Sequence, residues 1–240
     1  MILFVISFQF FYHVYLYRIK MLNYTDFALD SFYMTYVFLM TTGTITFIEA
    51  MRTNDKRIRN IMNLETCISI IAAFFYGKFI TSIEKKGVID YKEMNSTRYA
   101  DWAITTPIML LVLVLVFLYN TNGGALPISS YLVILLLNYG MLGFGYLGET
   151  GVMNKLFANI TGFVFFAGLY GYIYNTFLSK KYNFENMLLY FTFLILWTLY
   201  GVVYFMEDIS KNFGYNILDL FSKCFVGIFF WAYFTNVFKL

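Results

Sequence analysis

Lys223 and Asp219 are the residues of this chain best placed to do chemistry. Both lie in the last long apolar segment, with the carboxylate four residues before the amine. Residues four apart share one face of a helix, so the two groups should lie side by side. A lysine at membrane depth is energetically costly and marks a candidate functional site. Such an amine can form a Schiff base with an aldehyde chromophore, and the neighbouring carboxylate would balance its charge.

The third apolar segment carries a second set of polar residues. Arg98, Asp101 and Thr105 recur three and four residues apart, so they form one stripe along a helix. Charged side chains within a membrane face the interior of a helix bundle and pair with one another. A protonated Schiff base on Lys223 would supply the positive partner of Asp101. Pro107 removes one helix hydrogen bond, and we expect a kink there.

The composition is that of an integral membrane protein. Of 240 residues, 60% are hydrophobic, 22% aromatic and only 13% charged, whereas a soluble domain carries about 25% charged residues. Long continuous apolar runs favour helices over barrel strands, which would alternate. The net charge of +3 is small and gathers in loops, so no nucleic-acid partner is expected. Cys67 and Cys224 lie in apolar segments, and neither a disulfide scaffold nor a metal site is expected.

Seven apolar segments are long enough to cross a membrane, which predicts an all-α seven-transmembrane-helix bundle. Their ranges are 31–51, 60–82, 98–118, 127–147, 154–177, 186–206 and 213–238. Residues 31–240 should form one transmembrane domain, with short connections apart from a charged one at 83–97. Residues 1–30 form an extra short N-terminal apolar segment, either an interfacial helix or an extension ahead of a start at Met21.

Basic residues predict the orientation of the bundle. The loop at 52–59 holds three arginines and a lysine, and the loop after the fifth segment holds Lys180 and Lys181. Lysines in the opposite loops are diluted by acidic residues. Positive loops lie on the cytoplasmic side, so we expect an extracellular N-terminus and a cytoplasmic C-terminus.

Two motifs together resemble the microbial (type 1) rhodopsin family. Arg98 begins the motif RYADWxxTTP, and Asp219 begins DxxxK in the last segment; the resemblance covers about residues 31–240. It implies all-trans retinal bound covalently to Lys223 as a Schiff base. It also implies that Asp101 is the primary counterion and proton acceptor, Asp219 the second counterion, and Arg98 a gate toward the extracellular half.

The resemblance further implies a pocket around the retinal. Aromatic side chains clamp a flat polyene through large apolar contact areas. The matching positions are Trp102, Trp197, Tyr200 and Tyr204 along the polyene, Met109, Met141 and Gly145 near its ring, Thr106 and Asn138 as a pair joining two helices, and Tyr76 as the hydrogen-bond partner of Asp219.

The chain departs from the pump pattern at one position. Outward proton pumps of the family carry a carboxylate eleven residues after the counterion, where this chain has Val112. Glu65 precedes Tyr76 by eleven residues on a helix of opposite direction, so it should lie near the level of Val112. We expect Glu65 to be a relocated proton donor or a cytoplasmic gate, because low-dielectric surroundings favour a neutral carboxyl. The alternative is that Glu65 caps its helix near the surface.

Light-driven ion transport, and no enzyme activity, is therefore expected. An outward proton pump is favoured; a light-gated cation channel, by similarity to rhodopsins of large DNA viruses, is the alternative, and a photosensor the third. Glu49 either lines a cytoplasmic exit or is an interfacial charge. Glu207 and Asp208 are either proton-release groups or solvated loop acids. The expected partners are membrane lipid, protons or small cations, and copies of the chain in a trimer or pentamer.

Overall fold

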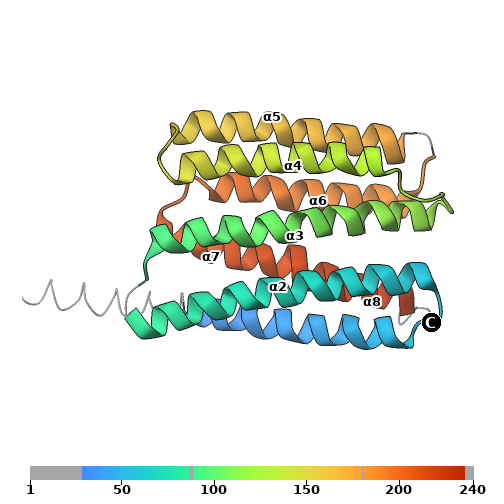
Figure 1. Cartoon of the computed structure of the whole chain (residues 1–240), viewed down its shortest axis with the longest axis horizontal. Coiled ribbons are helices and arrows are strands. Elements are labelled where there is room, and N and C mark those ends of the chain that lie inside the picture. Colours follow the sequence, from blue (N-terminus) through green and yellow to red (C-terminus); the bar gives the residue numbers. More distant parts are fainter. Residues whose placement is uncertain (1–28, 87–88, 180, 236–240) are drawn as a thin grey trace, which may run out of the picture.

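A computed structural model describes residues 29–86, 89–179 and 181–235, and in these ranges the chain is a bundle of long helices (Figure 1). Within these ranges, seven helices are long and apolar enough to cross a membrane, as the sequence predicted. The N-terminal apolar segment expected at residues 1–30 lies almost entirely outside the described residues.

The helices follow one another with short connections. The first runs over Leu29–Arg52 and is followed by α2 (Lys56–Lys86), α3 (Tyr91–Asn120) and α4 (Ile128–Glu149). The fifth span joins α5 (Lys155–Ile173) to the π-helical turn η1 (Tyr174–Leu178), and α6 (Phe184–Val203) is the sixth. The seventh combines α7 (Asp208–Asp219), π-helical η2 (Leu220–Phe225) and α8 (Val226–Thr235).

The connection expected at 83–97 is mostly helix, which corrects the sequence-based expectation. The second helix continues to Lys86, and α3 begins directly after Asp90, whose side chain accepts a hydrogen bond from the Glu93 backbone N–H. Such an N-cap satisfies a backbone donor that would otherwise lack a partner. Lys86 Nζ also lies 2.5 Å from the Glu93 carboxylate, so charged residues stabilise both helix ends.

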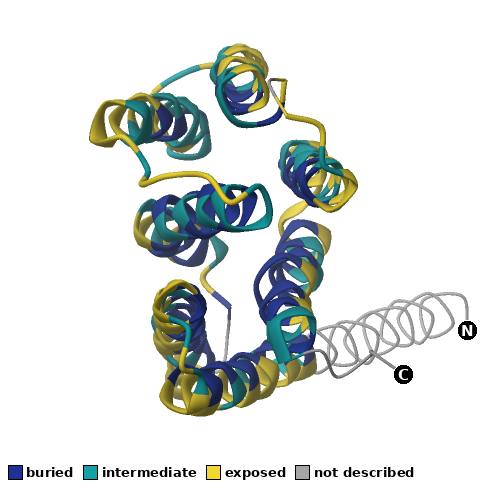
Figure 2. Cartoon of the chain, turned by 90° about the vertical axis from the view of Figure 1, so that its right-hand side faces the viewer, coloured by how far each residue is buried: buried dark blue, intermediate teal, exposed yellow. Residues whose placement is uncertain are grey.

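The third helix lies in the middle of the bundle. In the most apolar stretch of this helix, 61% is buried inside the bundle. The corresponding share for α4 is 11%, and the apolar side chains of α4 mostly face outward. Viewed along the helices, the buried residues face inward and the exposed ones outward (Figure 2). This outer apolar surface suits contact with lipid. Arg98, Asp101 and Thr105 of α3 are consequently buried among the other helices.

The seventh span changes its helical pitch at the residues singled out by the sequence. Asp219 ends α7, and Lys223 lies within the π-helical turn η2. Single π-helical turns within α-helices often occur at functional sites. The third helix, in contrast, is continuous through Pro107.

Candidate functional site

Four buried charged groups meet in the centre of the bundle. Lys223 Nζ lies 2.7 Å from Asp101 Oδ2 and 3.4 Å from Asp219 Oδ2, and an Arg98 guanidinium nitrogen lies 4.0 Å from Asp219 Oδ2. All four residues are at most 1% exposed. Two cations therefore face two carboxylates, and this balance is required for buried charges.

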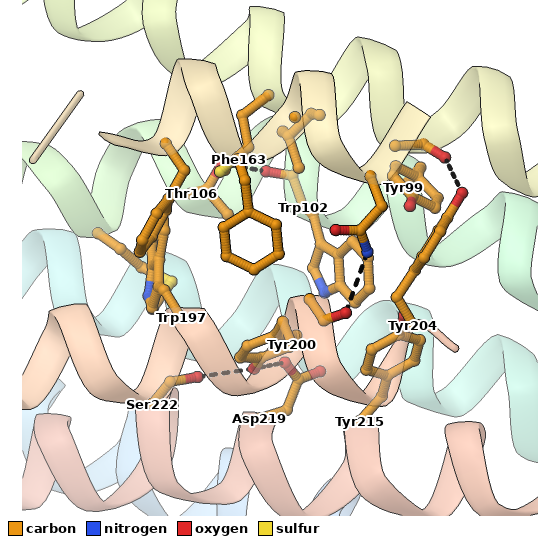
Figure 3. A pocket seen from close by; sticks show the side chains of 18 of the residues that line it. Tyr99, Trp102, Thr106, Phe163, Trp197, Tyr200, Tyr204, Tyr215, Asp219 and Ser222 are labelled. Atoms are coloured by element: carbon orange, nitrogen blue, oxygen red, sulfur yellow. Dashed lines mark hydrogen bonds between the residues drawn. The ribbon is translucent and has the colours of Figure 1, made fainter. Parts of the chain in front are cut away.

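Asp219 is held by hydroxyl donors in addition to the cations. The Tyr76 hydroxyl donates to Asp219 Oδ2 at 2.9 Å, and the Tyr200 hydroxyl donates to Oδ1 at 2.6 Å. Ser222 lies 2.9 Å from the Tyr200 hydroxyl, and Figure 3 shows this line of contacts. Both oxygens of Asp219 thus accept hydrogen bonds from tyrosine hydroxyls.

Asp101 has a different environment. One of its oxygens accepts from Lys223, and the other has no hydrogen-bond partner among the described residues. The Thr105 hydroxyl, one turn along α3, donates to the Asp101 backbone carbonyl at 2.9 Å and not to the carboxylate. Asp101 therefore has a free acceptor position next to the Lys223 amine.

Arg98 lies on the side of Asp219 away from Lys223 and is held there by hydrogen bonds. Its Nε donates to Asn212 Oδ1 at 2.8 Å, and a terminal nitrogen donates to Asn216 Oδ1 at 2.5 Å. Aromatic rings surround the guanidinium with their centroids 5.1 to 5.7 Å away; they belong to Phe32, Tyr76, Phe79 and Tyr215. Cation–π contacts of this kind stabilise a partly desolvated cation.

A largely apolar cavity is lined by Lys223 and Asp219 and extends between helices α3 to α6. Figure 3 shows Trp197 at one end and Tyr204 at the other, with Phe163 and Trp102 between them. The lining includes Tyr99, Trp102, Thr106, Met109, Met141, Gly145, Asn159, Phe163, Phe166, Trp197, Tyr200, Tyr204, Tyr215 and Ser222. Flat aromatic walls with a buried amine among the lining residues fit an apolar conjugated aldehyde such as retinal.

Asn138 lies beside this cavity and joins two of its helices. Its side-chain amide donates to the Thr106 hydroxyl at 2.9 Å, and that hydroxyl donates to the Trp102 carbonyl at 2.7 Å. The Tyr204 hydroxyl similarly donates to the Gly145 carbonyl at 3.1 Å. These bonds tie α4 to α3 and to the end of α6 around the cavity.

Glu65 is buried in the other half of the bundle. It is 2% exposed and lies well inside α2, which begins at Lys56, so the interpretation of Glu65 as a surface cap is wrong. A Cβ atom added to Gly227 would lie 3.1 Å from the Glu65 carboxylate and 2.7 Å from Thr42. The carboxyl therefore occupies space left by a glycine of α8. Val112 is fully buried.

Among the three peripheral acids, Glu49 is 8% exposed and lies 3.9 Å from Arg52. Glu207 and Asp208 are both exposed, and Asp208 also forms an ion pair with Lys211 at 2.9 Å. Asp208 is therefore a solvated acid that is anchored to the buried Lys211.

The sequence reasoning missed the asparagines that hold Arg98. Asn212, Asn216, Asp219 and Lys223 recur at spacings of four, three and four, which places them on one helix face. Extending the stripe back from Lys223 would have found both. Tyr215, Ser222 and Asn159 were also missed, because a tyrosine, a serine or an asparagine alone carries no distinctive signal.

Comparison with known proteins agrees with this geometry. The profile of the bacteriorhodopsin-like protein family matches residues 27–237, so the chain belongs to this family. A green-light absorbing proteorhodopsin from Gamma-proteobacterium EBAC31A08 is 26% identical over 230 residues, covering 88% of this chain and 87% of the relative.

Solved structures show the same architecture. The crystal structure of viral rhodopsin OLPVRII is 56% identical, with a TM-score of 0.84, covering 89% of this chain and all of that one. Xanthorhodopsin, described as a light-driven ion pump with dual chromophore, shares the fold at 18% identity, with a TM-score of 0.70 over 88% of this chain and 92% of its own. The chain is thus a microbial rhodopsin, an integral multi-pass membrane protein of a retinal-binding family whose members carry out light-driven ion transport.

Proposed function

We propose that this protein is an outward light-driven proton pump with all-trans retinal joined to Lys223. The observation that carries the proposal is the contact of Lys223 Nζ with Asp101 Oδ2 at 2.7 Å, where Lys223 lines the aromatic cavity. The amine of Lys223 would attack the aldehyde carbon, form a C=N bond and release one water molecule. The polyene of the retinal would be held by the aromatic side chains of Trp102, Trp197, Tyr200 and Tyr204.

The two carboxylates have different tasks in this proposal. When bound, retinal supplies light absorption and light-driven isomerisation. Asp219 is the second counterion in this proposal, and its oxygens are already engaged by Tyr76, Tyr200 and Arg98. Asp101 is nearer to Lys223 and has an oxygen without a partner among the described residues, so it receives the proton from the Lys223 nitrogen.

Glu65 would return a proton to Lys223 from the cytoplasmic half. A buried carboxyl favours the neutral form and so can hold a proton at rest. Outward pumps of the family carry a carboxylate at the position of Val112, and the valine side chain here cannot hold a proton. Arg98, on the far side of Asp219, would separate Asp101 from the extracellular half.

A light-gated cation channel is the second candidate, and one observation favours it. Glu65 lies near a group of polar side chains between the first helix and α2: the hydroxyls of Thr46 and Thr66 are 2.9 Å apart, and Thr42 lies close to Glu65 across Gly227. Polar groups at membrane depth are typical of ion pathways. Glu65 would then be a gate and not a donor.

Illumination of intact cells tests the pump. Cells that produce the protein and are supplied with retinal should acidify their medium in light, and a protonophore should abolish the change. Asp101→Asn should reduce the acidification at least about a hundredfold, since the proton acceptor is removed. Asp55→Asn, in the loop before α2, is the matched control and should acidify normally. Undiminished acidification by Asp101→Asn would contradict the assignment.

We also propose that the N-terminus is extracellular, the C-terminus cytoplasmic and the protein a homo-oligomer in the membrane. The basic loop at 52–59 supports the orientation. The exposed apolar faces of α4 and α5 suit either lipid or a second copy of the chain. Native mass spectrometry from lipid nanodiscs would separate a trimer, a pentamer and a monomer.

A further inference from the structure

An ion cluster around the buried Lys211 lies at the end of the bundle beyond Arg98. Lys211 Nζ lies 2.7 Å from Glu149 Oε1 and 2.9 Å from Asp208 Oδ1, joining the end of α4 to the start of α7. The Lys211 side chain is only 2% exposed and that of Glu149 is 10% exposed, whereas that of Asp208 is 54% exposed. Removing one member of a buried ion pair leaves its partner uncompensated, so the cluster depends on Lys211.

Two asparagines connect this cluster to Arg98. The Asn95 amide donates to Glu149 Oε1 at 2.7 Å and to Asp208 Oδ1 at 3.2 Å. The Asn212 amide donates to Asn95 Oδ1 at 2.9 Å, and Arg98 Nε donates to Asn212 Oδ1 at 2.8 Å. Asn95 and Asn212 are 4% and 1% exposed, so water does not compete freely for these bonds.

The hydrogen bonds from Arg98 through Asn212 and Asn95 to the carboxylates form a chain in which each donor faces the same way. The carboxylates only accept, so the amide group of Asn95 must turn toward them and its carbonyl toward Asn212. That carbonyl and the Asp208 backbone carbonyl, each 2.9 Å from the Asn212 amide nitrogen, orient the Asn212 side chain so that its own carbonyl faces Arg98. Hydrogen bonds arranged in such a chain polarise and strengthen one another. Side-chain amides do not titrate at neutral pH, so the chain transmits orientation and does not carry protons.

We propose that Lys211 is a positioning residue for Arg98. It fixes the Glu149 and Asp208 carboxylates, which orient Asn95 and Asn212, and these hold the guanidinium beside Asp219. The position of Arg98 then sets the positive charge felt by Asp101. This inference rests on the proposed function, because its main readout is the visible absorption of retinal at Lys223.

Other titratable groups face the same region. Those near Asp101 are Lys223, Asp219 and Arg98. Those around the ion cluster are Lys155 of α5 and the phenols Tyr91, Tyr99, Tyr204 and Tyr215. Lys155 is the useful comparison: its amine lies near Asp208 and over the Tyr204 ring, and no hydrogen bond joins it to the asparagine chain among the described residues.

The test is a titration of the visible absorption band against pH in the retinal-bound protein. Protonation of Asp101 changes the colour, because it removes the negative charge beside the chromophore nitrogen. Lys211→Met should move the midpoint of this change to higher pH, equivalent to about a fivefold increase in the proton affinity of Asp101. The released carboxylates no longer orient Asn95, so Arg98 loses its hydrogen bond to a fixed Asn212 while it keeps the one to Asn216. Lys155→Met removes the same charge at the same end and should change the affinity by less than about twofold.

The variant Asn95→Leu distinguishes the contribution of the hydrogen-bonded asparagines from the direct effect of the Lys211 charge. It removes no charge, so an upward shift of the midpoint in this variant can come only from loss of the chain. In the Asn95→Leu background, Lys211→Met should add no more than Lys155→Met does. If Lys211→Met fails to assemble, the midpoint of Asn95→Leu decides whether the hydrogen-bonded asparagines position Arg98. Lys211→Arg keeps the positive charge and should keep the original midpoint.

A second readout does not depend on transport. The nitrogen-15 NMR signal of Arg98 Nε should move in Lys211→Met and Asn95→Leu but not in Lys155→Met. Equal midpoint shifts in Lys211→Met and Lys155→Met, or an unchanged midpoint in Asn95→Leu, would overturn the inference while leaving the pump intact. A wild-type protein that forms no visible band with retinal would instead overturn the proposed function.

Discussion

At the scale of single residues, the charges at the centre are interdependent. Lys223 and Arg98 are buried with Asp101 and Asp219, and each cation lies within 4.0 Å of a carboxylate. Breaking one such buried pair costs about 3–5 kcal/mol, because the remaining charge has no partner. The site therefore keeps its charge balance at rest and changes it only when a proton moves.

Lys223 should be the attachment point of retinal. After incubation with all-trans retinal and reduction with borohydride, wild type should carry one retinyl group by mass spectrometry, on the peptide that contains Lys223. Lys223→Ala should carry none, since its side chain lacks the amine. Lys78→Ala, which removes the lysine over the Phe74 ring on α2, should be labelled as wild type is. Labelling of Lys223→Ala would contradict the assignment.

Glu65 should govern the return of the proton. In Glu65→Gln the side chain keeps its shape but cannot donate, so the decay of the deprotonated state after a flash should slow by about 10- to 100-fold. Flash absorption spectroscopy measures this decay. Glu185→Gln, in the first turn of α6, makes the same chemical change at a helix end and should leave the decay unchanged. An unaltered decay in Glu65→Gln would remove Glu65 from the proton route.

At the scale of elements, the helices bring these residues together by close approach at small side chains. Gly227 of α8 faces Thr42 of the first helix and Glu65 of α2. A larger residue there would push the seventh span away from the other two. In contrast, a Cβ added to Gly171 of α5 would meet nothing within 4 Å.

These two glycines provide a matched pair. Gly227→Ala should lower the stability of the protein by about 1–3 kcal/mol, because the added methyl overpacks the contact. Gly171→Ala should raise it by about 0.5–1 kcal/mol, since alanine loses less backbone freedom on forming a helix. Unfolding titrations in detergent, followed by loss of the visible band, would measure both. Equal stabilisation of the two variants would show that the first helix, α2 and α8 are packed less closely around Gly227 than the structure shows.

The sequence predicted the seven spans and their order because continuous apolar runs are a strong signal. It did not predict where the helices end, because α2 and α3 continue through charged residues that cap and pair beyond the apolar core. Helical spacing brought Asp219 next to Lys223, and Arg98 next to Asp101 on α3. It could not predict that the Thr105 hydroxyl bonds its own backbone, or that η2 is π-helical, since both depend on packing.

At the scale of the whole molecule, the bundle places unlike polar groups in its two halves. Toward the end where α3 begins lie Arg98, its asparagines and the Lys211 cluster, linked continuously by hydrogen bonds. Toward the other end lie Glu65 and the Thr46–Thr66 pair, and Val112 belongs to the buried apolar core. The proposed pump would use this asymmetry, with Glu65 as the proton store on one side of Lys223 and the Arg98 network on the other.

Photocurrent under voltage clamp tests the central claim most directly. Membranes containing the retinal-bound protein would be illuminated at voltages on both sides of zero, with equal and then unequal proton and sodium gradients. A pump moves each charge against a field worth about 2.3 kcal/mol per 100 mV, so we predict an outward current of one sign at every voltage. A current that reverses near the equilibrium potential of a cation would contradict the pump and identify a channel.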